Sequence, residues 1–468
     1  MDEIVIAWNR FGLGGRQQDR VGDDPRHALL RQFDRFDPRP AMLRERPTTA
    51  DAIAHYKRLT EAQRNQRQQA RAKGMAISEA QANAPEAIQQ MRRDMRQAYL
   101  ANVHARAASA IASNAPFVER LVHFWANHFA VSIEKGAVTA LSGPHEFEAI
   151  RPHVLGNFRH LLRAASLHPA MQLFLDQAQS IGPNSQLAQR AATRGRDAGL
   201  NENLAREILE LHTLGVRSGY TQGDVTELAR AMTGWTVDGF RRMSGLKVFD
   251  DHSAYLPQIH EPGARQVLGR RYANNGAQQV LDILDDLATH PATAHHIATK
   301  LARHFAGDEP PATLVSRLES AFLGSNGDLL STYIALVEAP EAWAAQPLKF
   351  RQPWEWVIAS LRAMDAAPPS PQMLNGLLVN LGQPTWQPGS PAGFADEASH
   401  WAAPDALIRR VESGQRMARL AREQDIPALA ERLFPDSLGE HTRLALARAE
   451  SPQQAMALLL AAPEMMRR

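Results

Sequence analysis

The segment Asn201–Trp235, NENLAREILELHTLGVRSGYTQGDVTELARAMTGW, decides the fold that we expect for this chain. Leu204, Ile208 and Leu211 recur at the spacing of an amphipathic helix and form one apolar stripe. Gly215 follows this stripe, where a left-handed C-cap is least costly for glycine. A first helix is therefore predicted to end at the glycine, with a tight turn after it.

A second helix is predicted to begin directly after this turn. Thr221 and Asp224 have the spacing of a capping box, in which each residue hydrogen-bonds the backbone of the other. Leu228 and Met232 continue an apolar face, and Gly234 ends it. The whole segment thus predicts a helical pair that buries one side against the rest of the protein.

The first helix also presents charges on the side away from its apolar stripe. Glu207 and Glu210 place two carboxylates there, with Arg206 beside them, and we predict these three residues as a candidate catalytic group. Such carboxylates would divide acid and base roles, as in glycoside hydrolysis, and their mutual repulsion would raise one pKa. The simpler alternative is structural, with Arg206 and Arg230 neutralising both carboxylates.

The composition excludes several classes of protein and site. The 468 residues carry 52 Lys plus Arg against 50 Asp plus Glu, a balance too even to indicate nucleic acid or a membrane surface as partner. The chain has no cysteine, which excludes disulfides, thiolate metal sites and cysteine nucleophiles. No apolar run approaches the roughly 20 residues of a membrane span. The N-terminus lacks the pattern of a secretory signal, so we expect a cytoplasmic protein, or a periplasmic one if the N-terminus was trimmed.

Most other segments also predict helices. Ala, Gln, Arg and Glu dominate 41–110, which predicts long solvated helices, and 116–132 predicts a helix with a mixed apolar and polar surface. Residues 365–404 are rich in Pro and Gly and are expected to wrap the surface, pinned by tryptophans. We therefore predict an all-α fold with minor β pieces. It is a single domain over 1–468, with two lobes, 1–182 and 200–468, as an alternative that the loop 182–199 would join.

Several motifs in order along the chain resemble the bacterial family DUF1800, a domain of unknown function. The resemblance covers about residues 8–468. Its motifs are NRFGLGGR at 9–16, FWANHF at 124–129, NENLAREILELHTLGV at 201–216, GYTQGDV at 219–225, ARAMTGW at 229–235, HEPGARQVLG at 260–269, HPATAHHIATKLARHF at 290–305, LGQPTWQPGSPAGFAD at 381–396, and SPQQAMALLLAAPEMMRR at 451–468.

This resemblance implies a mostly α-helical protein and carries no established activity. Genes of the family often lie beside one for a protein similar to the alkaline-phosphatase/sulfatase superfamily, which implies such a protein as a partner, and many members carry export signals. The chain departs from the family pattern at Glu261, where aspartate is expected, and at Arg265, where lysine is expected. Both departures keep the charge.

A divalent metal is one cofactor that the residues would suit. With 18 histidines and no cysteine, ligands would be His, Asp or Glu from converging elements. We predict His128, His260 and Glu207 as ligands, supported by Glu210. His212 is excluded, because at ~100° per residue it lies far around the helix from both carboxylates. The alternative for His128 is a buried imidazole hydrogen-bonded to a carbonyl.

An anion site is the second possibility. Arg206, Arg265, Lys300 and Arg303 would surround a phosphate or carboxylate, with Arg265 and Lys300 as the cofactor-binding residues. Against this, the basic stripe of 296–304 also fits a solvated helix face. No G-x-S-x-G elbow for a serine nucleophile occurs.

Three function classes remain open: a metal-dependent enzyme of hydrolase type, a small-anion binder, and a non-catalytic partner of a phosphatase-superfamily protein. The first two make a common structural prediction, because buried ionisable groups need partners. We expect one cavity to be lined by the residues His128, Arg206, Glu207, Glu210 and His260.

Overall fold

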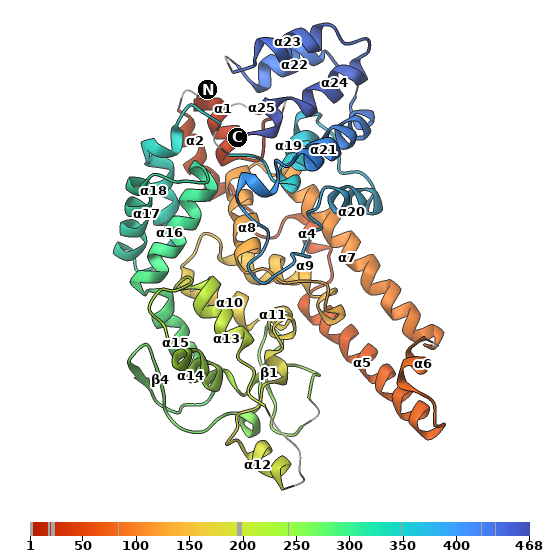
Figure 1. Cartoon of the computed structure of the whole chain (residues 1–468), viewed down its shortest axis with the longest axis vertical. Coiled ribbons are helices and arrows are strands. Elements are labelled where there is room, and N and C mark those ends of the chain that lie inside the picture. Colours follow the sequence, from red (N-terminus) through yellow and green to blue (C-terminus); the bar gives the residue numbers. More distant parts are fainter. Residues whose placement is uncertain are drawn as a thin grey trace.

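Helices make up nearly all of the regular structure in the computed structural model of the chain (Figure 1). The strands are short and form one antiparallel sheet in the order β1-β3-β2 and one hairpin, β4-β5. The predicted all-α fold with minor β pieces is confirmed. The structure describes residues 3–16, 19, 24–82, 84–193, 199–241, 243–347, 349–422, 424–435 and 437–468.

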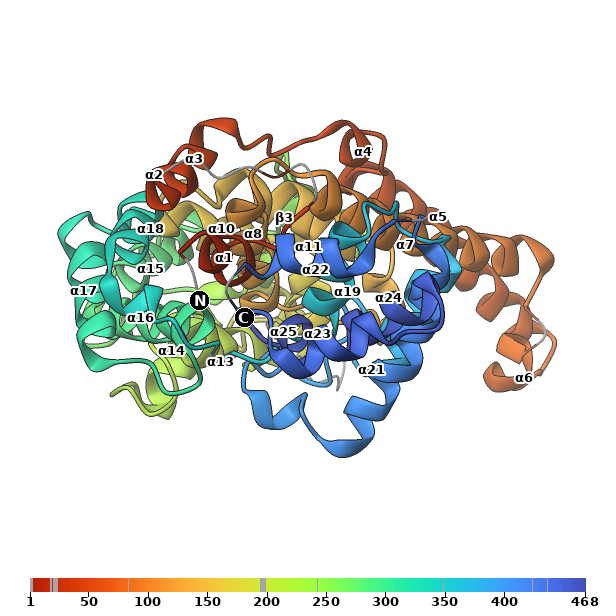
Figure 2. The same cartoon turned by 90° about the horizontal axis from the view of Figure 1, so that it is seen from above.

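The N-terminal part of the chain contains a long helical arm that projects from the body (Figures 1 and 2). The arm has a small core of its own, formed by Leu59, Ala84 and Ile88. Its helices α5 and α7 are long, as the sequence predicted, and the helical structure is interrupted near Gly74 and Pro85. The elements of this part are α1 (Glu3–Ile6), η1 (Ala7–Phe11), α2 (Pro25–Leu30), α3 (Gln32–Arg35), α4 (Ala41–Arg44), α5 (Thr49–Ala72), α6 (Ile77–Ala82), α7 (Glu86–Ala112) and α8 (Pro116–His128).

The middle of the chain begins with short helices and contains all of the strands. The loop predicted at 182–199 includes the helix α12, and its residues 194–198 lie outside the described residues. The elements are η2 (Gly136–Val138), α9 (Ser142–Pro144), η3 (His145–Ile150), η4 (Arg151–His153), α10 (Phe158–Leu167), α11 (Pro169–Phe174), η5 (Gln177–Gln179), α12 (Gln186–Ala192), α13 (Asn203–Glu207), η6 (Ile208–His212), α14 (Gln222–Met232), β1 (Trp235–Val237), β2 (Lys247–Val248), β3 (Ser253–Tyr255), η7 (Pro257–Ile259), β4 (Arg265–Val267) and β5 (Arg270–Tyr272).

The segment 201–235 folds as a helical pair, with one difference from the expectation. Helix α13 passes into the π-helical turn η6, and a π-turn holds more residues than an α-turn. Leu209 is therefore fully buried, while Leu211, which the regular repeat placed on the apolar stripe, is only half-buried. Gly215 has the expected left-handed backbone (φ +91°), and the capping box that opens α14 is present.

In the C-terminal part, α15–α18 lie along one side of the molecule and α22–α25 lie at its top in the view of Figure 1. Residues 381–403 contain only the short turn η9, and Trp386 and Trp401 are buried, as expected for a wrapping segment. The wrap is shorter than predicted, because 371–380 is helical. The elements are α15 (Ala277–Ala288), α16 (Pro291–Ala306), α17 (Ala312–Gly324), α18 (Leu329–Glu338), η8 (Pro340–Trp343), α19 (Pro353–Ala363), α20 (Pro371–Asn380), η9 (Ala398–His400), α21 (Pro404–Met417), η10 (Ala418–Leu420), α22 (Ile426–Leu433), α23 (Glu440–Ala447), α24 (Pro452–Ala461) and α25 (Pro463–Met466).

Two large apolar cores hold the body together. One gathers side chains of α8, α10, α14 and α16, and the other gathers side chains of α7, α19 and α24. Each core draws residues from both sides of the loop 182–199. The choice between one domain and two lobes stays a prediction. Among the described residues, no helix is both long and apolar enough to cross a membrane.

Candidate functional site

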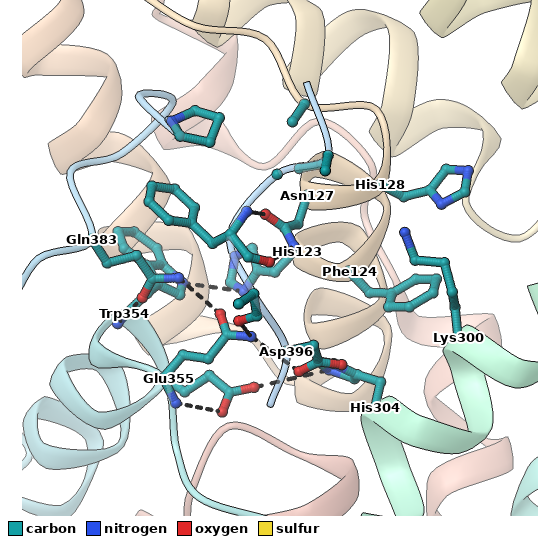
Figure 3. Close-up of a pocket in the computed structure, with 18 of the residues that line it drawn as sticks. His123, Phe124, Asn127, His128, Lys300, His304, Trp354, Glu355, Gln383 and Asp396 are labelled. Carbon is teal, nitrogen blue, oxygen red and sulfur yellow. Dashed lines mark hydrogen bonds and ion pairs between the residues drawn. The ribbon is translucent and has the colours of Figure 1, made fainter. Parts of the chain in front are cut away.

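A pocket of about 720 Å³ lies where α8, α16 and α19 meet the wrapping segment 381–403 (Figure 3). Its walls come mainly from residues 120–131, 296–304, 352–355 and 383–401. A volume of this order suits a small organic molecule. Because its walls come from segments far apart in the sequence, the pocket exists only in the folded chain.

Helix α8 supplies one wall and anchors the wrap. Arg120, His123 and Asn127 recur at helical spacing on its pocket side. The Asn127 amide donates to the carbonyl of Phe394 (2.9 Å) and accepts from its N–H (2.8 Å). Gly393 has φ +81°, and a Cβ atom there would lie 2.3 Å from the Asn127 backbone oxygen. Only glycine therefore allows the wrap to approach α8 this closely.

Glu355 is the centre of a buried charge network at the base of the pocket. Its carboxylate pairs with Arg120 and accepts hydrogen bonds from Arg468 at 3.0 and 3.1 Å. Burial would raise the pKa of Glu355, but the two arginines outweigh it and hold the pKa well below its usual value. Glu355 also completes a capping box with Gln352 at the start of α19. The network therefore joins α8, α19 and the C-terminal Arg468 through compensated charges.

Asp396, in the wrapping segment 381–403, lies in a second group of contacts that compensate its negative charge. It accepts from His304 Nδ1 (3.1 Å) and from the Gln352 amide (3.0 Å), and Lys349 Nζ lies 3.5 Å away. Burial would raise the pKa of Asp396, but His304 and Lys349 hold it below its usual value. Asp396 is thus a partner for its neighbours rather than a free acid.

Lys300 differs from the other cations of the pocket. Among the described residues its ammonium has neither a hydrogen bond nor an ion pair, whereas the arginines that line the pocket are each paired with a carboxylate. Burial, reinforced by the charge of Arg303, lowers the pKa of Lys300 from 10.5 to about 8, although Asp396 and Glu397 oppose this. The amine is therefore an uncompensated charge facing the cavity.

Three histidine rings lie around this amine. Burial and the charge of Lys300 lower the pKa of His212 to about 3, that of His296 to about 4, and that of His128 well below 6.5. His128 Nε2 lies 3.1 Å from the His212 carbonyl oxygen and His296 Nε2 lies 3.1 Å from that of Leu211. Each of these two nitrogens must carry a hydrogen to donate, so both rings are neutral and keep Nδ1 as an acceptor.

The carboxylates predicted on α13 and η6 do not line this pocket. Arg206 bridges Glu202 (3.3 Å) and Glu210 (3.5 Å). Of the structural alternative, in which arginines neutralise both Glu207 and Glu210, the structure therefore contains the Glu210 pair alone among the described residues. The expected role of Arg230 is different, because it pairs with Glu227 instead. Glu207 has no hydrogen bond or ion pair among the described residues, and burial, with Glu210 beside it, raises its pKa.

The predicted residues His260 and Arg265 also lie outside the lining of the pocket. His260 Nδ1 lies 2.7 Å from the Thr233 carbonyl oxygen, which ties the ring to the end of α14. Arg265 donates to the carbonyl of Gly263 (3.2 Å) and pairs with Glu227 (3.4 Å). Both side chains therefore fasten their own loop to the helical pair.

The predicted ligand set for a metal is not assembled. Within the described part of the chain, no group of three or more His, Asp or Glu side chains is placed to hold a metal ion. Of the three predicted ligands, only His128 lines the pocket; His260 and Glu207 do not. His212 is fully buried, as the helical-wheel argument predicted.

A comparison with models of protein families identifies the family of this chain. A family model described as "Protein of unknown function (DUF1800)" matches residues 6–467. The chain belongs to the DUF1800 family. Neither the curated proteins nor the solved structures contain a match.

Several motifs on which the DUF1800 resemblance rests line the pocket. FWANHF supplies Asn127 and His128, and the wrap motif ends in Asp396. Sequence reasoning found Lys300 but missed Glu355, whose signal was a capping-box spacing after Gln352. Arg468 had no comparable signal, because its contact joins residues 113 positions apart.

Proposed function

We propose that the pocket of this DUF1800 protein binds a small organic anion, whose negative charge is held by Lys300 and Arg303. The observation that carries the proposal is the ammonium of Lys300, which lines the pocket without a hydrogen bond or ion pair to any described residue. Lys300 is partly buried, and an ammonium that is taken out of water without a bonded carboxylate lowers the stability of the fold. An anionic ligand would supply the missing partner.

The neighbouring carboxylates support a ligand rather than an internal partner for Lys300. Asp396 is held by His304, Gln352 and Lys349, and Glu397 pairs with Arg303 at 3.4 Å. Moving either of them to Lys300 would break contacts that they already make. The ammonium therefore keeps its attraction for an anion that enters from solvent.

Arg303 offers a second donor on the same face of α16. It lies three residues after Lys300, the spacing at which side chains are neighbours on a helix. Its Nε–H is buried and has no hydrogen-bond partner within the described residues. A carboxylate or phosphate would satisfy this donor together with Lys300, since guanidinium groups bind such oxyanions through several N–H groups.

The remaining walls suit the body of an organic ligand. Phe124, Trp354, Trp386 and Phe394 give the pocket aromatic surfaces. Arg106 stacks over Trp354 at 4.1 Å and pairs with Glu146 at 2.8 Å. This pair is closer and more buried than the 3.4 Å pair of Arg303 with Glu397, so Arg106 is less free to bind a ligand. We expect an anion with an apolar or aromatic portion to bind more tightly than inorganic phosphate.

Calorimetric titration with phosphate, acetate, pyruvate and phenylpyruvate tests the proposal. We expect the organic anions to bind to the native protein, and Lys300→Met to abolish the heat signal. Lys300→Arg keeps the charge and should retain binding. Lys135→Met is the matched control, because Lys135 pairs with Asp176 outside the pocket. Binding that survives Lys300→Met unchanged would contradict the proposal.

Hydrolase-type activity and a bound divalent metal stay predictions at this pocket. The dispersed positions of His128, His260 and Glu207 lend no support to a metal held by those three residues. The anion proposal does not need a metal, because the cationic groups are side chains.

A non-catalytic partner role is the second function that a specific observation favours. The arm α5–α7 projects from the body and exposes Arg64, Arg67 and Arg71 on α5 (Figure 1). The resemblance to the family implied a partner of the alkaline-phosphatase/sulfatase superfamily. The exposed arginines would bind an acidic surface on such a partner. Co-purification of the two proteins, lost on changing the three arginines to glutamate, would support this role. Co-purification that the charge reversal leaves intact would refute it.

A further inference from the structure

We infer that the amine of Lys300 forms an imine with the carbonyl carbon of its ligand, and that the ligand class is the small 2-oxo acids. This inference rests on the proposed anion site and names its substrate. A 2-oxo acid carries a carboxylate for Arg303 directly beside a ketone for Lys300. The two cationic side chains lie one helical turn apart on α16, as such a ligand requires.

Nucleophilic attack needs the amine without its proton and without a competing salt bridge. Lys300 meets the second requirement, since no carboxylate is bonded to it among the described residues. The lowered pKa of about 8 meets the first, because a useful fraction of the amine is then neutral near physiological pH. The charged groups that act on it are Asp396 and Glu397 from the wrap and Arg303 from its own helix.

The histidines around Lys300 add acceptors instead of further charge. His128 donates from Nε2 to the His212 carbonyl, so its Nδ1 carries a free lone pair, and this atom is buried without a partner. Figure 3 shows the Lys300 side chain extending past Phe124 toward the His128 ring. His128 thus offers an unprotonated acceptor nitrogen on the side toward which the Lys300 amine extends.

The proposed step is a condensation that balances without any oxidant or reductant. The lone pair of the Lys300 nitrogen forms a C–N bond to the ketone carbon, and the carbonyl oxygen becomes a hydroxyl. That C–O bond then breaks, and the oxygen leaves as water with the two hydrogens that the neutral amine had carried. The product is an imine, which takes up one proton to become an iminium ion.

Reductive trapping tests the inference on the full-length protein. The native chain is incubated with pyruvate or phenylpyruvate and cyanoborohydride, which reduces an imine to a stable secondary amine. We expect one adduct with the mass of the ligand less one oxygen atom, placed on Lys300 by peptide mapping. Lactate, which has the carboxylate but no ketone, should give no adduct.

Two variants separate this inference from the proposed function. Lys300→Arg should bind pyruvate in the calorimeter but give no adduct, because a guanidinium is not a nucleophile at this pH. Lys135→Met should form the adduct as the native chain does. If the native chain binds pyruvate without an adduct, the imine is wrong and the anion site stands; if it binds no organic anion at all, both fail. Equal labelling of Lys135 and Lys300 would also overturn the inference, since it would indicate ordinary lysine reactivity.

Discussion

Lys300 carries a charge with no hydrogen bond or ion pair to any residue that the structure describes, and its titration should therefore show in the stability of the protein. Its pKa is about 8 in the folded chain and 10.5 as a free side chain. Between these values the unfolded chain binds more protons, so stability attributable to this residue rises with pH. Below about pH 8 the Lys300 ammonium is charged in both states, and the full loss of stability from its burial is present.

We predict that Lys300→Met raises the free energy of unfolding at neutral pH by about 1–3 kcal/mol, because it removes this cost. The difference from the native protein should shrink as the pH rises through about 8 to about 10. Denaturant unfolding of both proteins at several pH values checks this. A variant that is less stable than the native chain at neutral pH would mean that the ammonium has a partner.

At the same scale, single residues show what sequence patterns can predict. Of the four cations predicted for an anion site, Lys300 and Arg303 line the pocket, because helical spacing places both on one face of α16. The other two, Arg206 and Arg265, lie outside its lining. The same spacing logic also buried His212 correctly. It could not choose between a solvated face and a pocket wall, because that depends on the wrap, which lies about 90 residues further along the chain.

The helical pair at 201–235 provides a prediction about elements. Its capping box joins Thr221 and Asp224, so Thr221→Ala should cost about 1 kcal/mol. Glu207 has no hydrogen bond or ion pair within the described part of the chain, and its pKa is raised. Glu207→Gln should therefore change the free energy of unfolding by less than about 0.5 kcal/mol, or increase it. Thermal melts of Thr221→Ala and Glu207→Gln, compared with the native protein, measure the two changes in stability. A loss of several kcal/mol for Glu207→Gln would show that the carboxylate belongs to a buried ion pair.

The wrap provides a second prediction about elements. Gly393→Ala places a Cβ within 2.3 Å of the Asn127 backbone oxygen at a left-handed position, so the wrap must move away from α8. We expect a loss of more than about 1 kcal/mol of stability and of anion binding together. Gly389→Ala is the matched control, because it lies in the same wrap with open space around it. If both variants bind the anion equally well, the position of the wrap does not control anion binding.

The elements also show where local patterns failed. The charged residues Arg206, Glu207 and Glu210 suggested a site, but Arg206 and Glu210 pair within their own helical pair, and none of the three lines the pocket. Of the residues 201–235, Leu211 alone lines the pocket, and the π-turn moves it off the buried apolar stripe. A π-turn is not visible in a 3.6-residue repeat, so this part of the site could not be predicted.

For the whole molecule, the C-terminal residue is a tie between distant parts. Arg468 donates to Glu355, to the His304 carbonyl (2.9 Å) and to the Arg10 carbonyl (3.5 Å). Arg468→Met leaves the buried Glu355 with one partner fewer and should cost about 3–5 kcal/mol. Arg467→Met, at the exposed neighbouring position, should cost less than about 0.5 kcal/mol. Similar melting temperatures for the two variants would show that the tie is unimportant.

The fold as a whole was more predictable than the pocket. Periodicity and capping signals identified the helices, since these depend on residues a few positions apart. The pocket joins α8, α16, α19 and the wrap, and no local rule brings these segments together. What the sequence offered instead was a resemblance, whose motifs FWANHF and LGQPTWQPGSPAGFAD do lie in the pocket wall.

The most direct measurement of the central claim is the titration of Lys300 itself. Isotope-labelled lysine NMR, with the signal assigned by its loss in Lys300→Met, follows the amine in the native protein. The account predicts a midpoint near 8, as the burial of this unpaired ammonium requires, and a clear rise of that midpoint when phosphate or acetate is added. A midpoint at the ordinary value of 10.5 that no anion moves would contradict it.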